Sequence, residues 1–289
     1  MSSIAVLPRP DVEYTLQNVP AELAVPPQSP WHRLWNHDGL RRTLVVAAFL
    51  LLWEIIARIQ NNDLMLPTFG QTALALVDGF RTGELPAKAA ISLSLLLKGY
   101  ATGVACAFVL TSLAVATRWG RDLLFTLTAM LNPLPPIALL PLALLWFGLG
   151  QGSMVFVLVH SVLWPLALAT LTGFQSVPAT LRMAGRNYGL TGTRYVLHLL
   201  IPAALPSILS GLKIGWAFAW RTLIAAELVF GASSGKGGLG WYIFQNRNEL
   251  YTDKVFAGLA VVIAIGLAVD LLVFGTLEKL TVRRWGTQH

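Results

Sequence analysis

The sequence predicts an all-α protein that crosses a membrane about six times as a bundle of helices. Only 12% of its 289 residues are charged and 55% are hydrophobic, whereas a soluble domain carries about 25% charged residues. Six apolar runs are close to the roughly 20 residues that one helical crossing needs. The cations lie between these runs and not in one basic block, which favours membrane topology over a nucleic-acid surface.

The predicted spans are residues 40–59, 87–116, 123–149, 153–174, 206–230 and 255–277. Each should be a helix, because only a helix satisfies its own backbone groups in lipid. The third run carries four prolines, so we expect it to bend and to face a cavity. Residues 1–39 contain charges and prolines without an apolar core and are predicted to be a cytoplasmic tail. Residues 40–289 form the predicted transmembrane domain.

The distribution of Lys and Arg predicts the orientation of the chain. The bias places both termini, the loop 117–122 and the segment 178–206 in the cytoplasm, and the loops 60–86 and 231–254 outside. Residues 68–80 are weakly amphipathic and are expected to lie along the membrane surface. The glycine-rich run 231–240 lacks the G-x-x-x-x-G-K-[ST] pattern of a phosphate-binding loop. It predicts a flexible turn followed by a short helix.

The segment Pro178 to Pro206, here called the cationic segment, is the most unusual part of the sequence. It reads PATLRMAGRNYGLTGTRYVLHLLIPAALP and contains three arginines and a histidine. Connections between helices are normally much shorter. A turn bounded by Gly189 and Gly192 divides it, so it predicts a helix–turn–helix that meets a partner outside the membrane.

The cationic segment resembles the E-A-A-x-x-x-G-x9-I-x-L-P motif of inner-membrane permeases of bacterial ABC importers. Residues 183–185 stand at E-A-A, Gly189 at the glycine, and residues 199–202 at I-x-L-P. Residues 132–150 resemble the R-P-[IV]-P-P-L-A-W-L-P-L…W-F-G-[IL]-G pattern, and residues 225–227 resemble the end of V-A-A-E. Together these patterns resemble the permease subunits for nitrate, sulfonate, taurine and bicarbonate.

The resemblance implies a type I ABC importer permease in a bacterial inner membrane. Its expected partners are a second permease copy, two ATP-binding subunits that hold ATP and Mg²⁺, and an extracytoplasmic binding protein. The chain itself would be no enzyme and would hold no cofactor or metal. The cationic segment would be the coupling helix, seated in a groove of the ATPase. The residues expected to couple to the ATPase are Arg182, Met183, Ala184, Gly185, Arg186, Gly189 and Leu190.

Charged residues within the spans suggest the translocation path, because such charges are costly and often functional. Arg221 can bind a carboxylate or sulfonate with two parallel hydrogen bonds. The alternative is an ion pair with Asp270, or with Glu227 of another chain. Since residues six apart do not share a helical face, one of Arg221 and Glu227 is expected to line the pore and the other to brace a neighbour. The residues predicted for the path are Arg221, Glu227, Trp216, Trp220, Pro135 and Pro136.

Other polar residues within the spans have structural interpretations. Trp216 and Trp220 share one helical face and form either a gate or a helix contact. His160 is expected to be a hydrogen-bonded packing residue. Lys213 is expected to extend its ammonium group to the cytoplasmic headgroups, and Asp270 to pack or pair.

These observations predict the permease of an ATP-driven importer for a small anion resembling a sulfonate, taurine or nitrate. The alternative is an ion-coupled secondary transporter that works without an ATPase. That class would require repeated halves with paired broken helices, and the sequence contains no convincing repeat.

Overall fold

The computed structural model describes residues 38–115, 117–230 and 237–281, and within them every regular element is helical. This agrees with the all-α prediction. Residues 1–37 of the predicted N-terminal tail and residues 231–236 of the predicted glycine-rich turn lie outside the described residues.

The chain divides into two compact units between Ile55 and Ile56. The described part of the first unit is the beginning of α2 (Asp38–Gln60), which matches the predicted first span. Its side chains from Gly39 to Phe49 are exposed and largely apolar. An apolar helix without a polar stripe is typical of a membrane span.

The second unit contains all the other helices. The longer ones are α3 (Phe69–Arg81), α4 (Glu84–Val115), α5 (Arg118–Leu131), α7 (Gln151–Ser176), α10 (Ile201–Phe230), α11 (Leu239–Asn248) and α12 (Thr252–Ala268). The shorter ones are η2 (Pro136–Leu139), α6 (Leu140–Phe147), α8 (Ala179–Asn187), α9 (Gly192–Tyr195), η3 (Val196–Leu200), η5 (Val269–Phe274) and α13 (Gly275–Leu280).

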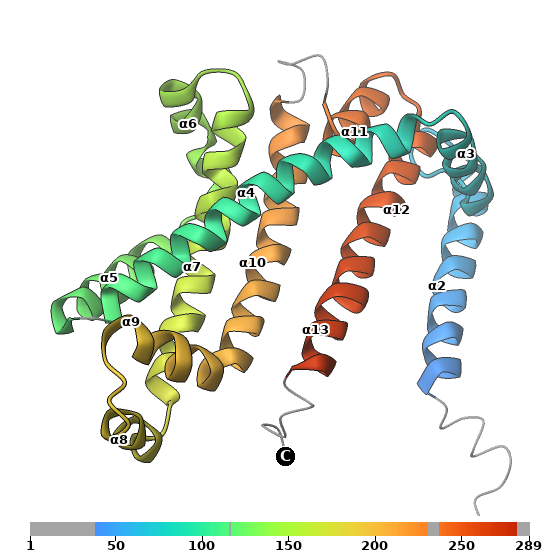
Figure 1. The fold of residues 1–289 in the computed structure, drawn as a ribbon. Coiled ribbons are helices and arrows are strands. Elements are labelled where there is room, and N and C mark those ends of the chain that lie inside the picture. Colours follow the sequence, from blue (N-terminus) through green and yellow to red (C-terminus); the bar gives the residue numbers. More distant parts are fainter. Residues whose placement is uncertain (1–37, 116, 231–236, 282–289) are drawn as a thin grey trace, which may run out of the picture. The chain divides into compact units, whose positions relative to one another are not determined.

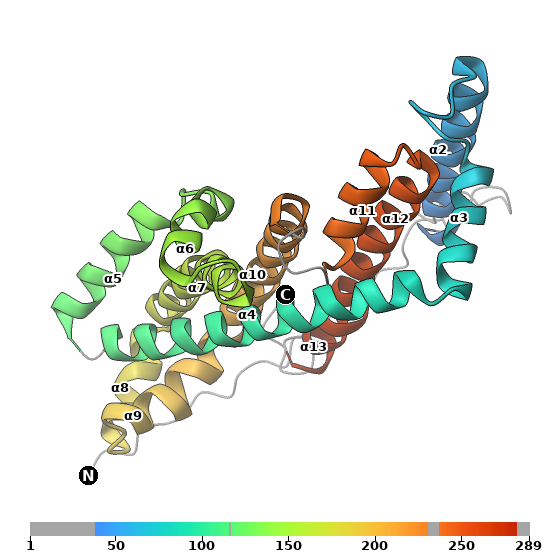
Figure 2. The ribbon, with the colours of Figure 1, turned by 90° about the horizontal axis from the view of Figure 1, so that it is seen from above.

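The helices α7 and α10 form the centre of this unit, and α4 passes α12 and α11 before it crosses α10 and α7 (Figures 1 and 2). Small residues allow the close approach. A Cβ atom at Gly211 of α10 would lie 2.6 Å from Ala169 Cβ of α7. One at Gly173 of α7 would lie 2.7 Å from Ser207 Cβ of α10. Because glycines let helix backbones approach closely in a membrane, α7 and α10 pack tightly against each other.

The third predicted span is broken, as its prolines indicated. The axes of α5 and of the helical stretch Pro136–Phe147 differ by 91°. Pro133, Pro135 and Pro136 have no N–H to donate, and Pro135 is extended, with φ −60° and ψ 120°. The helix therefore stops at Leu131 and starts again at Pro136.

Five helices in the described residues are long and apolar enough to cross a membrane, and the bent pair makes a sixth if it is counted as one span. The helix that carries the fifth predicted span begins before residue 206, where we expected the span to start. The helical stretch runs without interruption from Gly192 to Val229, because Leu199 and Leu200 are buried in the core and continue the apolar pattern.

Candidate functional site

Residues 179–195 of the cationic segment fold into α8, a turn and α9, beyond the ends of α7 and α10 (Figure 1), and its residues after 195 form η3 and the start of α10. The α8 helix begins after Pro178 and its C-terminal residue is Asn187. The helix–turn–helix prediction is therefore confirmed for residues 179–195. The turn places α8 outside the helical core, where a partner can reach it.

The turn depends on Gly189, whose φ of +75° is in the left-handed region. Its N–H donates to the carbonyl of Arg186 at 2.9 Å, and the N–H of Leu190 donates to the carbonyl of Gly185 at 3.0 Å. These two bonds form a Schellman motif, which ends a helix with glycine in the left-handed conformation. Gly192 also has a positive φ, +54°. The predicted glycine-bounded turn is thus confirmed.

Replacing Gly189 by alanine is expected to loosen this turn. Nothing lies within 4 Å of the added Cβ atom, so the cost comes from the backbone conformation alone and is about 1–2 kcal/mol. Hydrogen–deuterium exchange should show faster exchange at the amides of residues 188–190. Gly189→Asn is the control, because asparagine tolerates this conformation better. Unchanged exchange in the alanine variant would contradict the assignment.

Arg182 binds the end of a membrane helix, although we predicted it among the ATPase-coupling residues. Its Nε donates to the carbonyl of Val177 at 3.0 Å. Its Nη2 donates to the carbonyls of Phe174 and Gln175. The last carbonyls of a helix have no partner within the helix, and a cation there also interacts well with the helix dipole. Arg182 therefore fastens α8 to the C-terminal end of α7.

The other predicted coupling residues within α8 divide between an outer and an inner side of the helix, whereas Gly189 and Leu190 lie in the turn that follows it. Met183, Ala184 and Arg186 are exposed. Gly185 is buried, and a Cβ atom there would overlap with Leu199 Cδ1. Gly185 thus allows α8 to lie against the helix that enters the core. The sequence analysis did not single out Tyr188, which is 88% exposed beside the turn. An aromatic residue next to a turn glycine was the available signal.

The break in the third span lines a cavity of about 290 Å³, as predicted. Pro135 and Pro136 contribute one wall, His160 and Trp164 of α7 another, and Phe218 of α10 a third. The predicted hydrogen bond of His160 was wrong. Neither ring nitrogen has a partner among the described residues, and the same is true of Trp164 Nε1. The rings of His160 and Trp164 pack edge to face, with their centroids 6.1 Å apart.

Arg221 is exposed on α10, next to this cavity. Its Nε donates to the carbonyl of Ala217 at 3.1 Å, and its Cζ lies 5.0 Å from the centroid of the Phe218 ring. Asp270 instead pairs with Lys213, so the intrachain pair between Arg221 and Asp270 does not form in the described part of the chain. The guanidinium remains able to bind an anion.

Trp216 and Trp220 are buried between helices, which corresponds to the helix-contact interpretation. Trp216 packs against Tyr100 of α4 and Phe274 of η5, with ring centroids 5.3 and 6.5 Å away. Trp220 Nε1 donates to the carbonyl of Val262 at 3.2 Å. Their exposures are 8% and 6%, so in this structure neither ring lines an open path.

Glu227 has the bracing role that the helical geometry allowed. Its side chain is 2% exposed. Ser92 Oγ of α4 lies 2.9 and 2.8 Å from the two carboxyl oxygens, and the N–H of Gly240 donates to Oε2 at 2.9 Å. Ser92 Oγ also accepts from the N–H of Leu239 at 2.9 Å. Glu227 thus joins α10 to α4 and to the start of α11, and its side chain faces no open path in this structure.

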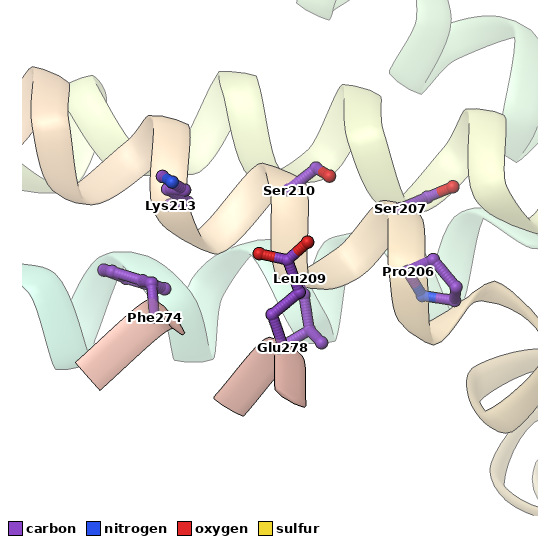
Figure 3. Close-up of a pocket in the computed structure, with 7 residues that line it drawn as sticks. All are labelled: Pro206, Ser207, Leu209, Ser210, Lys213, Phe274 and Glu278. Atoms are coloured by element: carbon purple, nitrogen blue, oxygen red, sulfur yellow. The ribbon is translucent and has the colours of Figure 1, made fainter. Parts of the chain in front are cut away.

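Lys213 was expected to reach the headgroups, but it pairs with Asp270 at 2.9 Å. It lines a second cavity, of about 360 Å³, together with Ser207, Ser210 and Glu278. Figure 3 shows Glu278 reaching toward α10 from α13. Asp270 belongs to η5, a π-helical turn, and such turns are frequent at functional sites. Two carboxylates near one ammonium make this cavity unfavourable for an anion.

No group of three His, Cys, Asp or Glu side chains in the described residues is arranged to hold a metal ion. The features that these residues form are an exposed face of α8, a set of hydrogen bonds from Arg182 to the end of α7, and a cavity beside Arg221.

Comparison with known proteins identifies relatives of this chain. Residues 99–275 match the family described as binding-protein-dependent transport system inner membrane component. A Methanocaldococcus jannaschii protein, named provisionally as an ABC transporter permease protein, is 33% identical over 78% of this chain and 84% of its own. The taurine transport system permease protein of Escherichia coli is 30% identical, over 82% and 86%. The nitrate import permease protein of Synechocystis is 28% identical, over 88% and 94%.

Proposed function

Because the chain belongs to the family of binding-protein-dependent transport system inner membrane components, we propose that it forms the path for a small oxyanion in an ABC importer. Its role as a multi-pass permease follows from the family and from the apolar helices. The substrate class is the further step. Two of its relatives are named for the transport of taurine and of nitrate, both of which carry a compact oxyanionic group.

The proposed assembly contains two copies of this chain, two ATP-binding subunits and a binding protein. The exposed side of α8, with Met183, Arg186 and Tyr188, is the proposed docking surface for the ATPase. The positive-inside rule supports a cytoplasmic location for this surface and for both termini. ATP hydrolysis would move the two copies as rigid bodies between inward-open and outward-open states.

Arg221 is the observation that carries the anion proposal. It lies nine residues before the end of α10 at Phe230, which is roughly 13 Å along the helix and within the depth of a hydrocarbon core about 30 Å thick. A charge at such a depth faces water or another protein group and not lipid. No carboxylate of the described residues pairs with it. An exposed guanidinium at this depth suits a passing anion.

Purification with the ATPase and the binding protein tests the general function. Co-purification, together with uptake that requires ATP, supports the importer. Uptake of an anion by this chain alone, in vesicles depleted of ATP, would instead support an ion-coupled secondary transporter. Membership of the family favours the importer over that alternative.

Arg221→Ala is expected to lower the uptake of an alkanesulfonate by about tenfold or more, because one hydrogen-bonded charge contributes about 1.5–3 kcal/mol. Assembly with the ATPase should be unchanged, since Arg221 is remote from α8 in sequence and its contacts among the described residues lie within α10. Arg221→Lys should be intermediate, because lysine keeps the charge without the bidentate geometry. Initial rates in reconstituted vesicles measure the effect. Wild-type kinetics in the alanine variant would reject this role.

A further inference from the structure

We propose that the cavity at the broken third span is an anion-binding site within the membrane, in which His160 and Trp164 donate hydrogen bonds to the transported oxyanion. This inference rests on the proposed function and adds the site at which the substrate pauses. It assigns a binding role to His160, which the sequence analysis interpreted as a packing residue, and to Trp164.

The walls of the cavity come from three parts of the chain. The proline break supplies one side, α7 supplies His160 and Trp164, and α10 supplies Phe218. Discontinuous helices are a recurring way to build a substrate site inside a membrane, because the break exposes polar groups only where they line a cavity. A volume of about 290 Å³ is at the small end of ligand sites, which suits a molecule of few heavy atoms.

Two residues that line this cavity have polar ring atoms without a hydrogen-bond partner among the described residues. His160 Nδ1, His160 Nε2 and Trp164 Nε1 are shielded from solvent and have no hydrogen-bond partner among the described residues. A buried polar atom without a partner is unfavourable. The two residues are four apart on α7, so they lie on the same face of the helix. A ligand that accepts hydrogen bonds and enters the cavity would remove this unfavourable state once the rings turn toward it.

The charge around the cavity favours an anion. No aspartate or glutamate is among the residues that line it. The lining residue Asn132 supplies a side-chain amide that can donate hydrogen bonds. The Arg221 guanidinium lies 5.0 Å from the ring centroid of the wall residue Phe218. The cavity beside Lys213, described above, is lined by Glu278 and adjoins Asp270. Of these two cavities, the one at the proline break is therefore suited to an oxyanion.

The test uses the reconstituted full transporter, with ethanesulfonate and nitrate as probes. Trp164→Phe and His160→Phe each remove donors while keeping a ring of similar size. We expect each to lower the uptake rate at saturating binding protein by about tenfold, the effect of losing one hydrogen bond to a charged group. His160→Gln, which keeps an amide donor, should recover at least part of the rate. The matched control is Trp241→Phe, because Trp241 stacks on Phe244 within α11 and does not line the cavity.

The outcomes separate this proposal from the proposed function. Loss of uptake in the Trp164 and His160 variants, with the Trp241 control within twofold of wild type, supports the site. Equal loss in all three variants, or wild-type uptake in the first two, overturns it. If His160→Gln is as slow as His160→Phe although both assemble normally, the hydrogen-bonding role of His160 is also rejected. Failure of the wild-type assembly to import either anion would reject the proposed function itself.

Discussion

Replacing Arg182 by alanine is expected to lower substrate uptake by at least tenfold while ATP hydrolysis continues. The side chain donates to three main-chain carbonyls at the end of α7, and a hydrogen bond from a charged group contributes about 1.5–3 kcal/mol. Without these bonds, α8 can still move with the bound ATPase, but its movement is no longer transmitted to α7. The number of ATP molecules hydrolysed per substrate imported, measured in proteoliposomes, should therefore rise.

Arg186 supplies a matched control on the same helix. It is exposed on the outer side of α8, so Arg186→Ala should weaken binding of the ATPase rather than uncouple a bound one. Co-purification of the ATPase measures that difference. Arg182→Lys should recover only part of the coupling, because one ammonium group does not reproduce the geometry of the guanidinium. An Arg182→Ala variant that imports as much substrate per ATP as the wild type would rule out a coupling role for the hydrogen bonds between Arg182 and α7.

Replacing Glu227 by alanine is expected to destabilise the permease by about 2–4 kcal/mol, because it leaves buried donors without an acceptor. The N–H of Gly240 and the hydroxyl of Ser92 both bond to this carboxyl group. The site is closely packed, since a Cβ atom at Gly240 would lie 2.6 Å from Glu227 Cβ. Water therefore has little room to replace the lost group. Thermal unfolding of the purified assembly in detergent measures the loss.

Two milder variants distinguish the hydrogen bonds from the volume of the side chain. Glu227→Gln retains the shape and one carbonyl oxygen for Gly240, so its loss of stability should be smaller than that of the alanine variant. Ser92→Ala removes the partner on α4 and the acceptor of the Leu239 N–H, and it should lower stability too. An alanine variant of Glu227 as stable as the wild type would show that the cluster does not hold α11 in place.

The sequence was sufficient to predict most of the fold, because membrane helices leave strong local signals. Apolar length identified the spans, and the prolines at 133, 135 and 136 identified the break and the cavity. The positive-φ glycine of the turn was also a local feature. The earlier start of the helix that carries the fifth span was not predicted, because Leu199 and Leu200 continue an apolar helix through a segment that is otherwise polar.

The candidate site was harder to predict, because its contacts join distant parts of the chain. Ser92 is 135 residues away from Glu227, and nothing near either residue indicates that they meet. Lys213 and Asp270 lie on different helices, so their pairing depends on how α10 and η5 pack. The surroundings of His160 could not be predicted from the sequence, because they depend on the cavity that the packed helices form. Local patterns predict which helices form, whereas side-chain partners depend on tertiary packing.

The joint at Arg182 has a consequence for how such a transporter can evolve. All three acceptors of its guanidinium are main-chain carbonyls, which every amino acid provides. Substitutions at residues 174, 175 and 177 therefore leave the acceptors in place as long as α7 ends where it does. The proposed link between α8 and α7 therefore depends on where the backbone of α7 ends, and not on which side chains stand at these three positions.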